Sequence, residues 1–595
     1  MILSACIMML GVSQIFAGVE HRMASPVRLS RDGRFLQTDG TPFIPLGGFH
    51  GNVMPMSLLE LSEDERREFE PNLWQGHLDL FDAPESVLQQ WFQYLAENGV
   101  TSLRLFPRAR VGMDVLDLCG EVNAELQAAF HRAFAAAEPY NIRFLLQIMP
   151  EPGRTGYINR RALESHVLPR FTQEEMENLT PAQKRFIIDN ETVKMAEYFT
   201  DPDVLACQKL YLKSVLEWVA DEPQIFALEI YNEQGWGGAR IDDKWQQVFT
   251  YPWEDAEIRW TGEIVRAIKE RLPEMPVCLS HPGFGITGFD PLKWSQGAEV
   301  DFYSQHLYAG LCGAGEDIDF APVTAATAAI ISARFINFPG EWGILNSKAP
   351  EAIRRRNHRD AIWLNMMTGG QGFMQWEYDF PEEYHWVNRI FQSLPVDFSP
   401  EPPDLAVEIG QAYRDFQTNT RYLLFSEDQW FSSWEFNRQK QADENIRKIF
   451  AAYQRSLELG VPIRFVMDQD DAMPLEQFLL TGSDEVICTS ATIRAPGGYQ
   501  LAYIRSNRIW VGYLRSRGIE KFNGHFLGVP TESPLNIRLN LPEGQYTVRV
   551  INLETDEIQK HSVTAPADIH VASETSDDYV LVITDAGVKL SSVLD

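Results

Sequence analysis

The sequence predicts an α/β protein with a (β/α)8 TIM barrel, a small βαβ-like segment and a C-terminal β-sandwich. Between residues 26 and 418, short β-rich runs alternate with longer helical patterns, which is typical of βαβ units. Two of these runs lead into a glutamate, Glu233 and Glu341, and barrels of this class carry their functional side chains at the carboxyl ends of strands. Residues 419–483 then suggest one further βαβ-like unit, and residues 484–595 show the short strands and turns of a sandwich.

Eight strand candidates occur in the barrel region, and helical stretches lie between them. The expected strands are Phe43–Leu46, Ser102–Phe106, Arg143–Met149, Phe226–Tyr231, Val277–Ser280, Asp301–His306, Phe335–Phe338 and Gly372–Trp376. The expected helices include Glu85–Glu97, Val122–Ala137, Val204–Ala220, Asp255–Arg271, Glu351–Met367 and Leu405–Phe416. In this count Glu233 follows strand 4 and Glu341 follows strand 7. A doubly wound open sheet is the main alternative, but no glycine-rich phosphate loop follows the first strand.

Composition limits the partners of this chain of 595 residues. Its formal net charge of −31 argues against non-specific binding to nucleic acid or to anionic lipid, because both require clustered Lys and Arg. A neutral substrate is easier to reconcile with this charge. Glu377, Asp379, Glu382 and Glu383 follow strand 8 and are expected to form a solvated loop rather than a metal site. No metal and no cofactor is expected.

The amino terminus, residues 1–25, resembles a signal peptide with a short lead. It is apolar and carries no charge before Glu20, and it is too short for an integral membrane span. This predicts a secreted or periplasmic protein, although a basic n-region is missing. The string Leu3-Ser4-Ala5-Cys6 also resembles a lipoprotein box, and a buried or disordered tail is a third alternative. The remaining cysteines are odd in number and scattered, so no disulfide framework or zinc spacing is visible.

The two glutamates match the requirements of glycoside hydrolysis. That reaction needs one carboxylic acid to protonate the leaving oxygen and one carboxylate to meet the positive charge that develops on the sugar. In retaining enzymes the two groups lie about 5 to 5.5 Å apart. Repulsion at this distance raises the pKa of one carboxyl and keeps it protonated near neutral pH. Strands 4 and 7 of a barrel could place Glu233 and Glu341 in this way.

The motifs around both glutamates resemble clan A retaining glycoside hydrolases, most closely the cellulase- and mannanase-like family 5. In that family an Asn-Glu pair ends strand 4, and Asn232 and Glu233 match it. The resemblance implies that Glu233 is the acid/base and that Asn232 binds the sugar 2-hydroxyl. The family nucleophile lies in a Gly-Glu-aromatic-Gly turn after strand 7, which Gly340-Glu341-Trp342-Gly343 resembles. Trp342, near the presumed mouth of the site, is expected to line a sugar subsite, and packing in the core is the alternative.

Further positions of the family pattern appear in the expected order. Arg104 corresponds to the arginine of strand 2, His306 and Tyr308 to the His-x-Tyr after strand 6, and Trp376 to the tryptophan after strand 8. Arg104 and Tyr308 are expected to hold the Glu341 carboxylate, and Trp376 to form an apolar floor under a sugar ring. His50 lies near the site in the segment that enters strand 1. One departure is Gln147, because the family often has a histidine after strand 3.

The leading function is a retaining glycoside hydrolase that acts on a β-linked polysaccharide or oligosaccharide by a two-glutamate double displacement. The segment after Tyr422 faintly resembles the flavodoxin-like domain of family 42 β-galactosidases, which supplies an alternative. A non-catalytic carbohydrate-binding barrel and a structural surface protein are the other classes. The carbohydrate substrate is the only partner that the sequence predicts. The sequence leaves open which sugar and linkage are cleaved, whether the action is endo or exo, and the oligomeric state.

Overall fold

The structure is a computed structural model of the chain, and a subset of its residues is described. The described residues are 25–30, 35–48, 53–59, 61–69, 77–80, 82–105, 124–149, 195–234, 239–241, 247–249, 254–282, 291–308, 320–332, 335–343, 351–376, 380–395, 398, 400–416, 443–467, 469, 471–480, 493–494, 499–506, 508–516, 520–522, 525–527, 535–571, 578–590 and 594.

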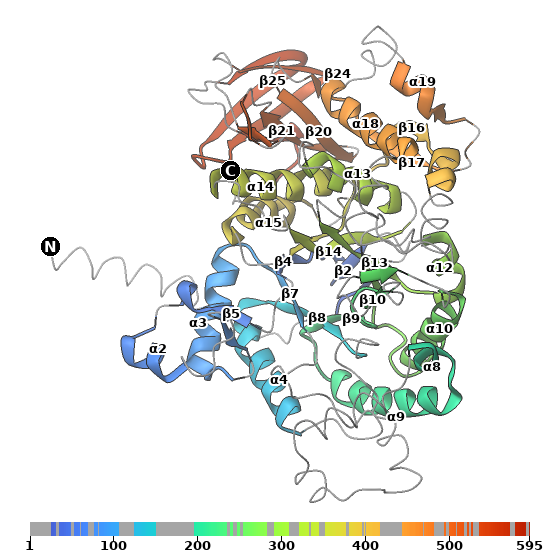
Figure 1. Ribbon diagram of the computed structural model, residues 1–595. Coiled ribbons are helices and arrows are strands. Elements are labelled where there is room, and N and C mark those ends of the chain that lie inside the picture. The colour runs from blue at the N-terminus through green and yellow to red at the C-terminus, as the bar shows by residue number, and fades with distance from the viewer. Residues whose placement is uncertain are drawn as a thin grey trace, which may run out of the picture.

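An eight-stranded parallel sheet forms the centre of the molecule and confirms the predicted barrel (Figure 1). Its strands follow the chain order β4, β7, β8, β9, β12, β13 and β14, and β15 pairs back to β4. Hydrogen bonds from Gln371 N to Asn337 O, 3.0 Å, and from Trp376 N to Trp342 O, 2.8 Å, join β15 to β14 and complete the ring. The bounds are β4 Leu46–Gly48, β7 Ser102–Leu105, β8 Arg143–Gln147, β9 Ile225–Glu229, β12 Val277–Pro282, β13 Phe302–Tyr308, β14 Asn337–Gly343 and β15 Phe373–Gln375.

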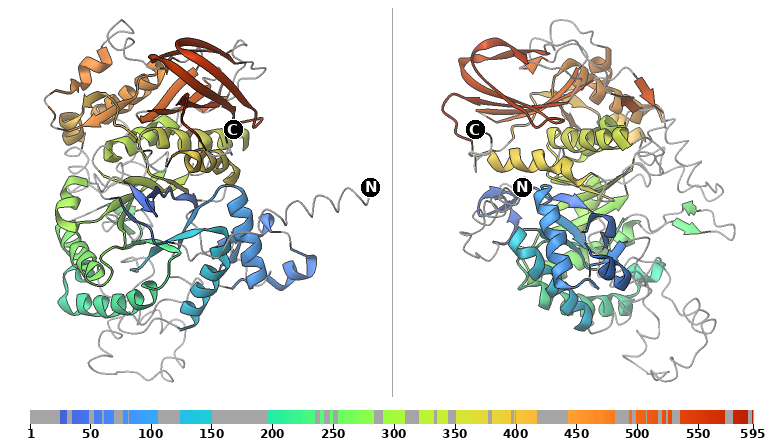
Figure 2. Two further views of the ribbon diagram at one scale, coloured as in Figure 1. Left: turned by 180° about the vertical axis from the view of Figure 1, so that it is seen from behind. Right: turned by 90° about the vertical axis from the view of Figure 1, so that its left-hand side faces the viewer.

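Helices surround this ring, as the views from behind and from the side show (Figure 2). Their apolar faces pack on the strands, and α9 illustrates how one begins: the side chain of Asp201 accepts hydrogen bonds from the N–H groups of Asp203 and Val204. The barrel helices are α3 Glu85–Glu97, α4 Ala124–Ala137, α8 Met195–Thr200, α9 Pro202–Val219, α10 Glu254–Arg271, α12 Pro291–Ala298, α13 Phe320–Ser332, α14 Glu351–Met367 and α15 Tyr384–Ser393.

Short elements complete the barrel region. Three small strands form a sheet near the amino ends of the barrel strands, where Val27, Leu36 and Phe43 join the apolar core inside the barrel. Along the chain, the other short elements lie before β7, directly before β8, after β9 and after β15. The bounds are β1 Arg28–Leu29, β2 Leu36–Thr38, β3 Thr41–Pro42, β5 Val53–Pro55, η1 Met56–Leu58, α2 Glu63–Phe69, β6 His77–Asp79, η3 Glu138–Tyr140, β10 Ala239–Ile241, β11 Gln247–Phe249 and η4 Pro381–Glu383.

A second, three-stranded parallel sheet begins earlier than the sequence indicates. Residues Leu405–Glu408 form β16, so the expectation of a helix over Leu405–Phe416 is wrong for its first turn. Val407 is fully buried and pairs with Phe465 of β17, and this pairing between distant segments is not visible in a local helical pattern. The remaining elements are α18 Glu444–Leu459, β17 Ile463–Val466, β18 Met473–Pro474 and α19 Leu475–Leu480.

The C-terminal region is an antiparallel sheet. Its two longest strands, β24 and β25, bend so that the sheet surrounds one apolar core. The register of β24 and β25 shifts between Leu539 and Gly544; β19 pairs with β24 before this shift, and β26 pairs with β24 after it. Side chains from both parts of β24 belong to one apolar cluster, as expected for a sandwich-like domain. The bounds are β19 Ile493–Arg494, β20 Tyr499–Ser506, β21 Ile509–Ser516, β22 Glu520–Phe522, β23 His525–Leu527, β24 Leu535–Asn552, β25 Ile558–Val571 and β26 Tyr579–Asp585.

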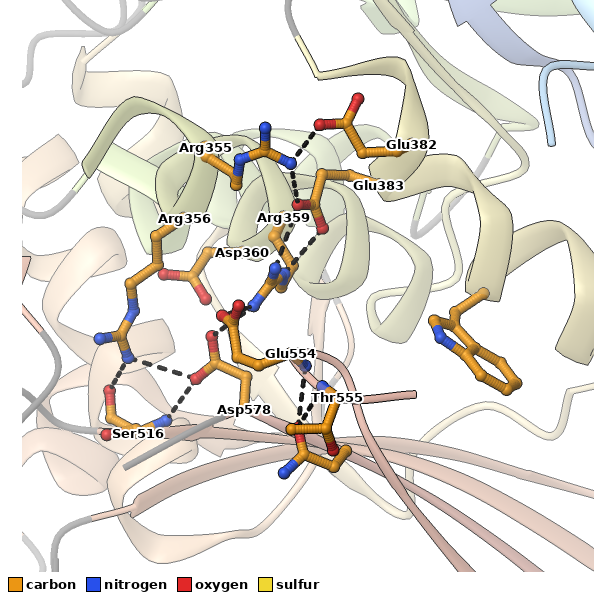
Figure 3. A network of polar contacts seen from close by, with 12 residues as sticks. Arg355, Arg356, Arg359, Asp360, Glu382, Glu383, Ser516, Glu554, Thr555 and Asp578 are labelled. Carbon is orange, nitrogen blue, oxygen red and sulfur yellow. Dashed lines mark hydrogen bonds and ion pairs between the residues drawn. The ribbon is translucent and has the colours of Figure 1, made fainter. Parts of the chain in front are cut away.

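The C-terminal sheet lies against barrel helix α14, and a buried network of charges joins them (Figure 3). Arg359 Nε donates to Glu383 Oε2 at 2.7 Å, and the same guanidinium pairs with Glu554 and Asp578. Arg356 donates to Asp578 Oδ1 at 3.2 Å. The expectation of a solvated loop is therefore wrong for Glu383, whose side chain is 8% exposed. Glu377 and Asp379 lie outside the described residues.

Further features concern the helices and the cysteines. Among the residues that the structure describes, none of the helices combines the length and hydropathy that a bilayer crossing needs. Cys207 forms a disulfide bond, which the scattered cysteine pattern did not indicate. Cys278 is a free thiol inside the barrel, and burial raises its pKa well above the usual value.

Candidate active site

The carboxyl ends of the barrel strands bring together five ionisable side chains. Arg104 comes from β7, Glu229 from β9, Glu233 from the turn after β9, His306 from β13 and Glu341 from β14. All except Glu233 are fully or almost fully buried, and the side chain of Glu233 is 12% exposed. The predicted pair and two of its predicted partners therefore lie in one site, where the fold class places its functional side chains.

Arg104 is the cation at the centre of the site. Its Nε donates to Glu229 Oε2 at 2.6 Å and its Nη2 contacts Glu229 Oε1, so the guanidinium and carboxylate pair through two bonds. Nη1 donates to Glu341 Oε1 at 2.5 Å. Burial acts to lower the pKa of Arg104, but Glu229 and Glu341 outweigh it and raise the pKa above its usual value. Arg104 is therefore charged, and it stabilises the ionised form of Glu341.

Glu229 was not predicted as a site residue. It lies in the run FALEIYNE, where a single carboxylate resembles the exposed residue of an alternating strand. Its direction is clear only in the structure, where Ala227, two residues earlier, faces the apolar core inside the barrel. Because strand side chains alternate, Glu229 must face the same interior and requires a buried cation.

Glu233 and Glu341 lie close to each other and to His306. One carboxylate oxygen from each, together with a nitrogen of His306, fall within 4.8 Å of one another. His306 Nδ1 is 3.1 Å from Glu233 Oε1 and 3.3 Å from Glu341 Oε2. Burial, Arg104 and His281 lower the pKa of His306 well below its usual value, so its ring is neutral. The histidine contacts both carboxylates without adding a second positive charge.

A β-bulge sets the direction of Glu341. Strand β14 pairs with β13 so that Gln305 faces Pro339 and His306 faces Glu341, which leaves Gly340 as an extra residue. Phe338 points into the barrel, and regular alternation would turn Glu341 outward; the extra residue turns it inward. A Cβ on Gly340 would lie 1.8 Å from Ser304 Oγ and 3.1 Å from Ser304 Cβ, so a larger residue at the bulge would require Ser304 to move.

The same bulge directs Trp342 away from the site. Its side chain is 5% exposed and packs against His358 and Phe373, with ring centroids 5.3 and 5.8 Å away, in the apolar layer outside the barrel. The expectation of a substrate contact through this ring is therefore corrected to a packing role. A sequence motif does not show the extra residue at Gly340 that turns this ring outward.

Asn232 lies beside the arginine. Its Oδ1 accepts a hydrogen bond from Arg104 Nη2 at 2.8 Å, and its side chain is nearly buried. Arginine only donates, so the amide oxygen must face Arg104 and the amide nitrogen must face away from it. Asn232 can therefore present an N–H donor to a bound hydroxyl.

The other predicted positions are only partly described. Trp376 is half-buried directly after β15, two residues beyond the inward-facing Met374. Tyr308 ends β13 and pairs with Gly343, but its side chain is outside what the structure describes, and so is His50. Gln147, the departure from the family pattern, is buried at the end of β8 and donates from Nε2 to Met149 O at 2.8 Å.

Glu233, His306 and Glu341 also have the ligand types that zinc accepts, with the distances given above. The charged Arg104 contacts one of these carboxylates and would oppose a bound cation electrostatically. The arrangement is better suited to general acid/base and nucleophilic chemistry, in which a carboxyl and a carboxylate act on opposite sides of one bond.

Comparisons with known proteins agree with the motifs. No family model matches the chain. A segment of 134 residues is 25% identical to a probable mannan endo-1,4-β-mannosidase F of Emericella nidulans, covering 20% of this chain and 28% of that protein. A segment of 195 residues is 24% identical to a probable mannan endo-1,4-β-mannosidase A of Aspergillus flavus, covering 31% and 46%. The chain thus spans less than half the length of these curated relatives, and the matches support the resemblance to family 5-like clan A glycoside hydrolases.

A solved structure supports the fold over nearly the whole chain. A catalytic mutant of Gan42B, a GH42 β-galactosidase from G. stearothermophilus, aligns with a TM-score of 0.50 at 9% identity. The alignment covers 93% of this chain and 99% of that chain. This similarity extends beyond the barrel to the regions that follow it.

Proposed function

We propose that this chain is a retaining glycoside hydrolase that cleaves β-linked sugars with Glu341 as nucleophile and Glu233 as acid/base. The observation that carries the proposal is the pair geometry, with one oxygen of each carboxyl within 4.8 Å. Retaining enzymes separate the two carboxyl groups by about 5 to 5.5 Å, whereas inverting enzymes need about 6.5 to 9.5 Å to admit a water molecule. The short separation favours a double displacement through a covalent glycosyl-enzyme.

Glu341 is suited to the nucleophilic role. It is 1% exposed, and Arg104 donates to one of its oxygens while His306 contacts the other. These donors keep the carboxylate ionised and fix its orientation toward the anomeric carbon. A fixed, desolvated carboxylate loses little further entropy on reaching the transition state.

Glu233 is suited to the acid/base role. Among the described residues around it, the site holds one cation, Arg104, and two other carboxylates, Glu229 and Glu341, while His306 is neutral. This charge balance disfavours a further anion and favours a proton on Glu233 in the free enzyme. After Glu341 becomes covalently bonded to the sugar it is no longer an anion. Glu233 can then remain ionised and act as a base toward water.

The substrate class follows from the site and the relatives together. A donor on Asn232 next to the nucleophile fits a sugar 2-hydroxyl, and the half-buried Trp376 fits the apolar face of a ring. β-1,4-Mannan is the first candidate because the curated relatives are described as mannan endo-mannosidases. A β-galactoside is the second candidate, because a GH42 β-galactosidase aligns over 93% of this chain.

We also propose that the protein is exported. The apolar, uncharged start of the chain resembles a signal-peptide core. The disulfide at Cys207 supports the proposal, because such bonds form and persist in oxidising compartments. Expression with and without residues 1–25, followed by fractionation of medium, periplasm and cytoplasm, tests it. Retention of the full chain in the cytoplasm would contradict export.

The decisive experiment is hydrolysis of mannans, glucans, xylans and galactans, with aryl β-glycosides, by the wild type and by Glu341→Gln. We expect one substrate class to be cleaved with retention of the anomeric configuration, and the variant to lose at least about a thousandfold in kcat. Glu270→Gln, an exposed glutamate on α10, is the matched control and should keep full activity. If Glu341→Gln cleaved the substrate at the wild-type rate, the assignment of Glu341 as nucleophile would be wrong. A product of inverted anomeric configuration would rule out the double displacement.

A further inference from the structure

The turn that carries Glu233 leaves the strand ladder in an unusual way. Leu228 N donates to Pro276 O and Ile230 N to Cys278 O, as in a regular parallel pair. The next bond to Ser280 O should come from residue 232, but it comes from Gln234 N at 2.7 Å. Two extra residues are therefore accommodated before Gln234, and Glu233 adopts a left-handed backbone with φ of +54°.

This bulge creates a backbone donor that the ladder cannot satisfy. The N–H of Glu233 has no strand partner in its left-handed position, and an unpaired buried N–H is costly. The side chain of Ser280 supplies the acceptor, with Oγ 3.2 Å from Glu233 N. Ser280 therefore holds the bulge twice, through its carbonyl to Gln234 and through its hydroxyl to Glu233.

The same hydroxyl determines the state of His306. Ser280 Oγ lies 3.4 Å from Arg104 Nη2 and 2.9 Å from His306 Nε2. Arginine and a backbone amide can only donate, so both face lone pairs of the hydroxyl, although Glu229 and Asn232 are the nearer acceptors of Arg104 Nη2. On the other side of the ring, His306 Nδ1 faces two carboxylate oxygens, which call for a donor at that nitrogen. The hydroxyl hydrogen must then point to His306 Nε2, which accepts it. A neutral ring that accepts at Nε2 carries its own hydrogen on Nδ1.

We propose that Ser280 is a positioning residue that fixes His306 with its hydrogen on Nδ1 and thereby directs the acid proton of Glu233. The Nδ1–H group faces Glu233 Oε1 at 3.1 Å and Glu341 Oε2 at 3.3 Å, and both oxygens accept from it. Because Oε1 is occupied in this way, a proton on Glu233 resides on Oε2, away from the histidine. In the other tautomer the Nδ1 lone pair would attract that proton, and the leaving oxygen would lose its donor. This role in catalysis rests on the proposed glycosidase function, whereas the tautomer itself does not.

The chain offers a matched control for Ser280. Ser304 lies on the neighbouring strand β13, is equally buried, and its Oγ has no hydrogen-bond partner in the described part of the chain. Ser280→Ala and Ser304→Ala therefore remove the same atom from adjacent strands inside the barrel. Only the first removes a bond to the histidine. Ser280→Thr keeps the hydroxyl and tests rescue.

The test reads the tautomer directly, by nitrogen NMR of protein labelled with ¹⁵N-histidine, with His306→Gln used to assign the signal. We expect a protonated Nδ1 and an accepting Nε2 in the wild type and in Ser304→Ala. In Ser280→Ala the hydrogen should shift toward Nε2, and Ser280→Thr should restore the wild-type pattern. A wild-type ring protonated at Nε2, or an unchanged signal in Ser280→Ala, would overturn the proposal whatever the activity.

Kinetics supply the second readout. Ser280→Ala should lose about tenfold or more in kcat on glycosides with poor leaving groups, because acid catalysis contributes about 10²- to 10⁴-fold. On aryl glycosides with activated leaving groups, Ser280→Ala should lower the glycosylation rate by less than about threefold. Equal losses on both substrates would indicate a purely structural role and overturn the proposal. A wild type that cleaves no glycoside, but whose Nδ1–H signal is shifted in Ser280→Ala, would overturn the proposed function and still support the assignment of Ser280.

Discussion

Arg104 and Glu229 form a buried, two-bonded ion pair that reaches across strand β8 from β7 to β9. Both side chains are fully buried, and the same guanidinium donates to Glu341. Arg104 thus donates hydrogen bonds both to Glu229, to which we assign no chemical step, and to Glu341, the proposed nucleophile. Without Glu229, the positive charge of Arg104 would be balanced by Glu341 alone.

Removing Glu229 should therefore affect both stability and chemistry. Glu229→Ala leaves Arg104 short of its principal partner, and breaking a buried pair in this way costs about 3–5 kcal/mol. The unfolding midpoint in urea should fall clearly. Activity should fall as well, because Arg104 can turn toward the vacated space and away from Glu341.

The control is an exposed pair with a similar contact. Lys209 Nζ lies 2.8 Å from Glu263 Oε2, and these side chains are 40% and 36% exposed. Glu263→Ala should change stability by about 1 kcal/mol or less, because water screens such pairs. Equal midpoint shifts for the two variants would refute the central role of Glu229.

Glu233→Ala should separate the two halves of the proposed reaction. Glycosylation of substrates with activated aryl leaving groups should persist, because these groups depart without a proton, whereas natural β-glycosides should be cleaved at least about a hundredfold more slowly. Added azide should accelerate turnover and yield a glycosyl azide of retained configuration, because a small anion needs no general base. Stopped-flow release of the aryl group and analysis of the product check both points. Equal losses on both kinds of substrate would show that Glu233 is not the acid.

The sequence predicted the barrel because each strand is a short apolar run, and burial on both faces makes such runs visible. It predicted Arg104, Asn232, Glu233, His306 and Glu341 as site residues through ordered motifs, and the structure brings these five together. The roles given to them remain proposals.

What the sequence missed depends on geometry that a pattern does not contain. Trp342 points outward because of one extra residue at Gly340, and a bulge cannot be counted from alternation. Ser280 was not recognised because a lone serine in a strand carries no signal until the displaced hydrogen bond of Gln234 is seen. The strand Leu405–Glu408 lies within a predicted helix because its partner strand is some sixty residues further along the chain, beyond the reach of a local pattern.

Arg359 should be essential to the contact between the barrel and the C-terminal sheet. Its side chain is 3% exposed, and Glu383, Glu554 and Asp578 surround its guanidinium. Arg359→Met fills a similar volume but leaves Glu383 and Asp578 buried with one cation fewer. The expected cost is about 3–5 kcal/mol, observed as a lower apparent Tm.

An exposed arginine in the C-terminal sheet supplies the comparison. Arg538 pairs with Asp568 at 2.7 Å, and their side chains are 45% and 52% exposed. Arg538→Met should leave the apparent Tm within a few degrees of the wild type, because exposed pairs contribute little. If Arg359→Met had the same apparent Tm as Arg538→Met, the buried network would not be what stabilises the contact.

His358 should make stability depend on pH. Its ring is 1% exposed, contacts Trp342, Phe373 and Tyr384, and has no hydrogen-bond partner at either nitrogen within the described part of the chain. Burial, followed by the charges of Arg355 and Arg359, lowers its pKa from 6.5 to about 3. Between these two values the unfolded chain binds a proton that the folded protein does not bind. Stability must therefore fall as the pH falls from about 6.5 toward 3.

His358→Phe removes this titration while keeping an aromatic ring among aromatic neighbours. The free energy of unfolding of this variant, relative to the wild type, should rise by about 1.4 kcal/mol for each pH unit below 6.5, and the difference should be constant above pH 7.5. Urea unfolding at four pH values from 8 to 5 measures this difference. His570→Gln, which replaces an exposed imidazole on β25, should follow the wild type throughout. A constant difference between His358→Phe and the wild type across this range would mean that His358 is protonated equally in the folded and unfolded chains.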